Sequence, residues 1–136
     1  MLKVLVTDAL APEGIEVLER ASGLEVVNTP GLSPEELLEA IGDADGLVIR
    51  SGTNVTAEVL AAADKLKVVG RAGIGVDNVD LAAASAKGII VMNTPFGNAI
   101  TTAEHALSMM MALARQIPKA DQSTQQGKWE KSRFMG

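Results

Sequence analysis

Five short apolar runs alternate with five segments of helical pattern along the chain, and this alternation constrains the fold more than any other feature. The runs are rich in Val, Ile and Leu and predict strands at Lys3–Thr7, Leu24–Asn28, Gly46–Arg50, Lys67–Arg71 and Ile89–Asn93. The other segments predict helices at Pro12–Ala21, Pro34–Ile41, Ala57–Ala63, Leu81–Lys87 and Thr102–Ile117. We therefore expect an α/β fold with a flavodoxin-like, doubly wound parallel five-stranded sheet, covered on both faces, in the order 2-1-3-4-5.

Two of the predicted helices have explicit capping signals. Ser33-Pro34-Glu35-Glu36 and Thr101-Thr102-Ala103-Glu104 each place a hydroxyl residue three positions before a glutamate. Such a pair satisfies two free N–H groups at the start of a helix, and proline suits the first helical position. We expect helices to begin directly after Ser33 and after Thr101.

Composition limits the classes of function. The 136 residues carry a net charge of −5 and include two Phe, one Trp and no Tyr, so neither a basic surface nor a stacking platform for nucleic acid is present. The absence of cysteine excludes disulfides and thiol chemistry, and no apolar run approaches the ~18 residues that span a bilayer. We expect a cytoplasmic protein that binds neither nucleic acid nor a membrane, and we find no signal for a metal site.

Polar residues follow the predicted strands where ligands bind in doubly wound sheets, outside the carboxyl ends. Arg50 and Ser51 follow the third strand, and Arg71-Ala72-Gly73-Ile74-Gly75 end the fourth. The two glycines permit a sharp turn with exposed N–H groups, and the arginines offer forked donors for a carboxylate or phosphate. A dinucleotide fingerprint would need a third glycine where Asn78 stands. The pattern predicts a site for a small anion, although such glycine pairs also occur in purely structural turns.

Single candidate residues outside these loops are better explained as structural. His105 is the only histidine, and no second acid, base or nucleophile accompanies it in the sequence. We interpret His105 as a structural residue and Glu104 as a helix cap. Asp77 and Asp80 are expected to brace the loop and to start the following helix, so the sequence predicts no catalytic residue in this chain.

The last predicted helix is apolar around most of its circumference. Its apolar stripe includes Leu107, Met110 and Leu113, but Met109 and Met111 are apolar as well. Such a helix is usually buried on most sides, and methionine-rich stretches usually belong to cores. We therefore expect a homodimer through residues 102–117, with residues 119–136 extending from it and poorly ordered unless the partner holds Trp129 and Phe134.

Several stretches resemble the D-isomer-specific 2-hydroxyacid dehydrogenases, most of all the members that act on 3-phosphoglycerate. They are collinear with the family over essentially the whole chain and comprise Val68–Asp80, Asn93–Asn98, Ala103–His105, Ala112–Pro118 and Gly127–Glu130. The resemblance implies NAD-dependent oxidation of 3-phosphoglycerate to 3-phosphooxypyruvate, which begins serine synthesis. It also implies that residues 1–98 are the N-terminal part of a substrate-binding domain. Residues 99–136 would then be the crossover helix and basic tail leading to a cofactor domain.

The resemblance also implies roles for individual residues. N–H groups at Gly73–Gly75 would hold the substrate carboxylate, and Arg50, Arg71 and Asn98 would hold its other polar groups. Ile74 and Thr102 would touch the cofactor NAD, and Lys131 and Arg133 would lend positive charge to a neighbouring subunit's pocket. The family's catalytic residues and its dinucleotide fingerprint do not occur in this sequence, so we expect the isolated chain to be inactive.

Three alternatives stay open. A related enzyme acting on glyoxylate, hydroxypyruvate or D-lactate would share the fold, whereas the two arginines and the basic segment 128–133 favour a phosphorylated substrate. A receiver-like binding module would need an aspartate and a lysine where the chain has Arg50 and Asn93. A flavodoxin-type electron carrier would need a hydroxyl-rich phosphate loop where Asp8-Ala9-Leu10-Ala11 stands.

Overall fold

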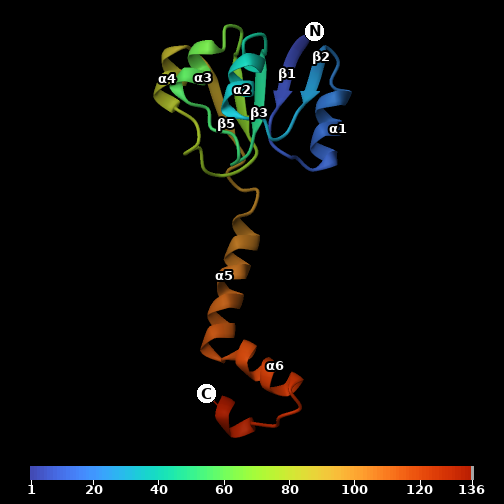
Figure 1. The fold of residues 1–136 in the computed structure, drawn as a ribbon, viewed down its shortest axis with the longest axis vertical. Helices are drawn as coiled ribbons and strands as arrows, with labels where there is room; N and C mark the ends of the chain where they lie inside the picture. The colour runs from blue at the N-terminus through green and yellow to red at the C-terminus, as the bar shows by residue number, and fades with distance from the viewer. Residues whose placement is uncertain (136) are drawn as a thin grey trace. The chain divides into compact units, whose positions relative to one another are not determined.

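The computed structural model describes residues 1–135, which form two compact units, one of residues 1–97 and one that begins at Asn98 (Figure 1). The strands of the first unit are β1 (Leu2–Val6), β2 (Leu24–Asn28), β3 (Gly46–Ile49), β4 (Val68–Arg71) and β5 (Ile90–Asn93). Its helices are α1 (Pro12–Arg20), α2 (Pro34–Ile41), α3 (Ala57–Ala62) and α4 (Leu81–Ala86). The second unit contains α5 (Ala99–Ala114), α6 (Ile117–Gln125) and the 3₁₀ helix η1 (Lys131–Phe134).

The five strands form one parallel sheet in the order β2-β1-β3-β4-β5, which confirms the predicted topology. One row of paired residues runs from Val4 through Gly46 and Val68 to Ile90. Because β1 lies between β2 and β3, the connections after β1 and β3 leave the sheet side by side. This is the switch point of strand order, where ligands bind in open α/β sheets.

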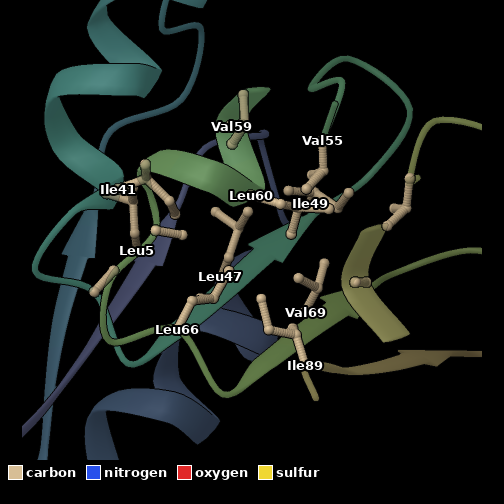
Figure 2. Packing of buried hydrophobic residues seen from close by; sticks show 14 of the residues in the cluster. Leu5, Ile41, Leu47, Ile49, Val55, Val59, Leu60, Leu66, Val69 and Ile89 are labelled. Atoms are coloured by element: carbon tan, nitrogen blue, oxygen red, sulfur yellow. The ribbon is translucent and has the colours of Figure 1, made fainter. Parts of the chain in front are cut away.

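The hydrophobic core lies between one face of the sheet and the three helices α2, α3 and α4. Figure 2 shows Leu5, Leu47 and Val69 projecting from three neighbouring strands toward Ile41 of α2 and Leu60 of α3. All five side chains are at most 1% exposed. Burying each side chain of this size contributes roughly 1.5–3 kcal/mol. The loops at the carboxyl ends of the strands therefore start from a sheet that is held in place by a well-packed core.

The opposite face of the sheet carries α1 beside β2 and is less completely covered. On this face Ile90 and Met92 are 62% and 55% exposed. A hollow of about 300 Å³ has an almost entirely apolar lining, which includes Leu18. Its charged residues, Asp45 and Lys67, form an ion pair of 3.0 Å with each other. The hollow therefore offers no free charge to an anion.

The capping box at the start of α2 and the predicted cap of α4 are confirmed. The hydroxyl of Ser33 accepts the Glu36 N–H at 3.2 Å, and the Glu36 carboxylate accepts the Ser33 N–H at 2.8 Å. The carboxylate of Asp80 accepts the Ala83 N–H at 2.9 Å. These contacts bind N–H groups that a helix start leaves free.

The predicted capping box at Thr101 is wrong. Helix α5 begins at Ala99, so Thr101 lies inside its first turn and donates its hydroxyl to the carbonyl of Asn98 at 3.0 Å. Glu104 is not a cap, and its main-chain carbonyl accepts the hydroxyl of Ser108 at 2.8 Å. A threonine hydroxyl inside a helix commonly donates to a carbonyl of the preceding turn. Thr101 makes this hydrogen bond and does not cap the helix. His105 is exposed on the same helix.

The end of α5 also differs from the prediction. The helix stops at Ala114 rather than at 117, because Gln116 adopts a left-handed conformation with φ of 51° and ψ of 34°. Pro118 follows, and a proline at this point cannot continue the preceding helix.

The expectation that residues 119–136 are poorly ordered without a partner is wrong for the described part, and Gly136 lies outside the described residues. Helix α6 and η1 occupy most of this segment. They are joined by the Ser123 hydroxyl, which donates to Glu130 at 2.7 Å, and by an ion pair of 3.2 Å between Arg133 and Glu130. Within residues 1–135, no helix is long and apolar enough to cross a membrane.

Candidate anion-binding site

The two arginine loops predicted from the sequence lie next to each other at the carboxyl edge of the sheet. Strands β3 and β4 are paired, with Ile49 opposite Arg71, and the Ala72 N–H donates to the Ile49 carbonyl at 2.8 Å. Arg50 follows β3 directly and is exposed, whereas Arg71 ends β4 and is half-buried. Both guanidinium groups therefore originate from adjacent positions on one rigid edge.

The glycine-rich loop after β4 exposes a row of main-chain donors. The Gly73 N–H donates to the Arg71 carbonyl at 2.9 Å in a three-residue turn. Contrary to the expectation, this N–H is therefore not available to a ligand. The N–H groups of Ile74, Gly75 and Val76 have no acceptor among the described residues. The open donors therefore begin one residue later than predicted.

Strand β5 braces this loop from the other side. The Asn93 side-chain amide donates to the Ile74 carbonyl at 2.7 Å, and the Thr94 N–H donates to the Gly73 carbonyl at 2.9 Å. The loop carbonyls are thus held by protein donors, while the next N–H groups stay open. Such an arrangement of main-chain donors suits an anion.

The side chain of Arg71 folds across its own loop. A Cβ atom at position 73 would collide with Nη1 of Arg71, so only glycine permits this placement. The Arg71 Nε is buried and has no hydrogen-bond partner in the described chain. Arg71 also lines a hollow of about 300 Å³, together with Val48, Gly70, Ala72, Met92, Asn93 and Thr94. An unpaired buried donor beside a hollow is a feature that an acceptor on a ligand would satisfy.

The loop after β3 is fixed by Asp8, which follows β1. Its Oδ2 accepts N–H groups from Arg50 at 2.6 Å, Gly52 at 3.2 Å and Thr53 at 3.1 Å. Its Oδ1 accepts the Thr53 hydroxyl at 3.0 Å, and that hydroxyl lies 2.8 Å from the hydroxyl of buried Thr7. Three N–H groups of this loop are therefore bound by a protein carboxylate, and the side chains of Arg50 and Ser51 are exposed.

The hydrogen bonds to Asp8 also affect its protonation. Burial alone raises the pKa of the Asp8 carboxyl, but the donors from Arg50, Thr53 and Gly52 outweigh burial and leave the pKa below its ordinary value. Asp8 is therefore ionised at neutral pH.

Asn78 connects the two arginine loops. Its side-chain amide donates to the carbonyls of Arg50 at 2.7 Å and Thr53 at 2.6 Å, and its own carbonyl accepts the Val55 N–H at 2.8 Å. The residue that replaces the third glycine of a dinucleotide fingerprint is therefore a bridge that sets the spacing of the two loops.

The other predicted site residues belong to the second unit. The Asn98 carbonyl accepts the Thr102 N–H at 3.0 Å at the start of α5. Lys131 and Arg133 lie in η1, where the Arg133 guanidinium pairs with Glu130 and sits 5.5 Å from the Phe134 ring centroid. The charge of Arg133 is thus partly neutralised within its own unit.

The site is built mainly from hydrogen-bond donors, a chemistry that suits an anion. Arg50, Arg71 and the open N–H groups are donors, and the nearby carboxylate of Asp8 is already hydrogen-bonded. Among residues 1–135, no three His, Asp or Glu side chains are grouped so that they could hold a metal ion.

Sequence reasoning missed Asp8 and the bridging role of Asn78. The predicted strand order places β1 beside β3, so an aspartate directly after β1 was the available signal. The signal for Asn78 was weaker, because an asparagine in a loop most often serves its own turn.

Comparisons with known proteins show the family to which the chain belongs. Residues 4–129 match the model of the catalytic domain of the D-isomer specific 2-hydroxyacid dehydrogenases. The chain therefore belongs to this family. Within it, the chain is similar to D-3-phosphoglycerate dehydrogenases, for example that of Homo sapiens with 55% identity over 134 residues, 98% of this chain. The chain spans about a quarter of the length of such relatives, 25% of the human protein and 26% of one from Methanocaldococcus jannaschii.

Solved structures show the same fold. The TT0316 protein from Thermus thermophilus matches 99% of this chain with a TM-score of 0.86 and 34% identity, and the match covers 45% of that protein. The 3-phosphoglycerate dehydrogenase of Entamoeba histolytica with bound NAD+ matches 82% of this chain with a TM-score of 0.72 and 36% identity, over 38% of its own chain.

Proposed function

We propose that this chain is the substrate-binding part of an NAD-dependent oxidoreductase that converts 3-phosphoglycerate to 3-phosphooxypyruvate. The observation that carries the proposal is the pair of arginines at the ends of β3 and β4, beside open N–H groups at residues 74–76. The similarity to D-3-phosphoglycerate dehydrogenases over nearly the whole chain supports it. Residues 1–98 would form the substrate-binding domain, and residues 99–136 the crossover to the rest of a longer protein.

The geometry suggests how the substrate would be held. A carboxylate accepts readily from two or three main-chain N–H groups, which the loop at Ile74–Val76 offers. The phosphate would lie toward Arg50 and Arg71, because guanidinium groups bind phosphate through two parallel hydrogen bonds. Ser51 would add a hydroxyl, and Asn98 would hold a further polar group of the substrate. Lys131 and Arg133 would lend positive charge to a neighbouring subunit's pocket.

The residues of this chain do not form a dinucleotide site by themselves. The sequence has no Gly-x-Gly-x-x-Gly, and Asn78, at the place of the third glycine, bridges two loops. Ile74, which is 43% exposed, and Thr102 would each contact NAD. The cofactor would be bound mainly by other parts of the longer protein, so we expect no NADH formation from the isolated chain with 3-phosphoglycerate. Turnover that survives repurification would contradict this.

Anion binding is the direct test of the site. In an NMR titration with 3-phosphoglycerate, we expect amide shifts at residues 50–53 and 71–78 with millimolar affinity, about −4 kcal/mol, because half of the cleft is missing. The variants Arg50→Ala and Arg71→Ala should each weaken binding, whereas Arg20→Ala, which alters an exposed arginine of α1, should not. Equal binding by all three variants would refute the assignment.

The same titration tests the alternative substrates. D-Lactate and glyoxylate lack a phosphate, so they should bind more weakly than 3-phosphoglycerate and should be less affected by Arg50→Ala. If D-lactate binds as tightly as 3-phosphoglycerate, a related 2-hydroxyacid dehydrogenase becomes the better assignment.

We further propose a homodimer through residues 102–117. Six large apolar side chains on α5 are at least 59% exposed: Ile100, Leu107, Met109, Met110, Met111 and Leu113. At the ~3.6 residues per turn of an α-helix they spread over about half of its circumference. Leaving each of them in water forgoes roughly 1.5–3 kcal/mol. A second copy offers the same self-complementary surface.

Sedimentation at tens of micromolar tests the dimer. We expect the wild type and the control Val17→Glu, at an exposed apolar position of α1 (68%), to be dimers. The double variant Leu107→Glu/Met110→Glu should be a monomer. A monomeric wild type would contradict the proposal.

A further inference from the structure

The hydrogen bonds around Asp8 converge on one short loop. This carboxylate receives four hydrogen bonds, three of them from the main chain of residues 50–53. All four donors lie more than forty positions further along the sequence. The contact is therefore a product of the sheet topology, and Asp8 has no comparable role in its own loop.

We propose that Asp8 is the positioning residue that sets Arg50 and Ser51 for anion binding, with Asn78 as its counterpart on the opposite side of the loop. The inference rests on the proposed function of this edge as an anion site. Asp8 acts through the loop and does not touch the ligand.

The two peptide groups that flank Arg50 are both fixed. Its N–H donates to the Asp8 carboxylate at 2.6 Å, and its carbonyl accepts the Asn78 amide at 2.7 Å. The direction of its Cα–Cβ bond is thereby fixed as well. The guanidinium donates to the Ala9 carbonyl at 3.3 Å, which ties its far end to the residue after Asp8. Both ends of the Arg50 side chain are thus held by the segment that follows β1.

The absence of a side chain at Gly52 is a second, independent sign of this arrangement. A Cβ atom there would lie 2.6 Å from Oδ1 of Asp8, closer than real Cβ atoms come to other atoms. Glycine at this position is therefore required by the approach of the carboxylate.

Ionic charge makes Asp8 an unusual neighbour for an anion site. A free carboxylate would repel an anionic ligand, but four donors bind the two oxygens of Asp8. A carboxylate is the side-chain group with enough acceptor capacity for all of them. An asparagine could preserve most of this pattern, because one oxygen can accept the three N–H groups while its amide donates to the Thr53 hydroxyl. Asp8→Asn is therefore the matched control for Asp8→Ala.

The test measures 3-phosphoglycerate binding and loop order by NMR in the wild type and three variants. In Asp8→Ala we expect about tenfold weaker binding, because the loss of Asp8 would displace the binding group of Arg50. We also expect lower amide order parameters at residues 50–53 and unchanged amide shifts elsewhere. Asp8→Asn should restore both. Asp64→Ala, which removes an exposed charge, should match the wild type. If Asp8→Ala does not fold, Gly52→Ala provides the same displacement without removing the carboxylate, and weaker binding with a mobile loop is expected.

A readout specific to Asp8 is the pH dependence of the loop. The amide shifts of Arg50, Gly52 and Thr53 should titrate together in the wild type and not in Asp8→Asn. Wild-type affinity and loop order in Asp8→Ala would overturn the inference. If the wild type itself binds no 3-phosphoglycerate, the proposed function fails. In that case the amide order parameters of residues 50–53 test the role of Asp8 by themselves. Unchanged order parameters in Asp8→Ala refute the proposal that Asp8 positions this loop, and reduced order parameters support it.

Discussion

The two units of the chain differ in the burial of their apolar side chains: the first unit buries many of them, and the second unit exposes them. Every buried hydrophobic residue among residues 1–135 lies between positions 4 and 89, in the first unit. In the described part of the second unit, Ser123 is the one buried residue, and α5 exposes most of its large apolar side chains. The first unit therefore has its own core, whereas the second is held by helical hydrogen bonds and a few polar contacts. Similar apolar content thus serves internal packing in one unit and, we propose, association in the other.

Separating the units should give the largest effect. We expect residues 1–97 alone to unfold cooperatively, and a peptide of residues 98–136 to lose most of its helix, because isolated helices of this length are marginal in water. Far-ultraviolet circular dichroism of both pieces measures this. If the peptide is helical as a monomer, the second unit does not need a partner and the difference between the units disappears. If it becomes helical only at high concentration, its helices are stabilised by self-association.

The same leucine-to-alanine change should have different effects in the two units. Leu60 is fully buried at 0% exposure, and Leu113 is 82% exposed. We expect Leu60→Ala to lower the free energy of unfolding by about 2–5 kcal/mol and Leu113→Ala by less than ~0.5 kcal/mol. Urea unfolding at a concentration where the chain is monomeric measures both, and comparable losses would contradict the comparison.

A polar contact between helices of the first unit should contribute less than its core. The Lys87 ammonium donates to the carbonyls of Leu60 at 2.5 Å, Ala63 at 3.1 Å and Ala61 at 3.3 Å, at the negative end of α3. Lys87→Met should lower the free energy of unfolding by about 1 kcal/mol. Lys65→Met, on an exposed lysine, is the control and should have almost no effect.

The smallest expected effect concerns acid. The pKa of Asp8 is below its ordinary value in the folded chain, so its contacts stabilise the fold above the unfolded-state pKa of about 3.9. That stabilisation is lost as the pH falls through the lower, folded-state pKa. The difference in unfolding free energy between the wild type and Asp8→Asn should therefore shrink below about pH 4. Asp64→Asn serves as the control, and a constant difference would show that Asp8 does not contribute in this way.

The sequence allowed the fold to be predicted because the first unit is locally consistent. Each strand contains at least two Val, Ile or Leu residues. Ser33 and Asp80 cap helices by rules that need only neighbouring residues. The positions of Arg50 and Arg71 at strand ends were predictable in the same way. What failed depended on competing local bonds: the hydroxyl of Thr101 bonded backward, and Gln116 interrupted α5 before Pro118.

The contacts within the site were harder to predict than their positions. Topology places β1 beside β3, but no local pattern says that the Asp8 carboxylate takes the N–H groups of the next loop. The Gly73 N–H turned back to Arg71, so the open donors begin at Ile74. Hydrogen-bond partners of this kind are set by packing in three dimensions, and the residue types at the strand ends do not specify that packing.

The position of β1 between β2 and β3 links the ligand site to the order in which the chain can fold. Strand β1 pairs with both β2 and β3, and the contact between Asp8 and Thr53 joins residues that lie 45 positions apart in the sequence. The Arg50 loop therefore takes its shape only when β1 and β3 have paired. By linkage, a bound anion must favour that pairing. It would slow hydrogen exchange of the β1 amides, although it touches none of them.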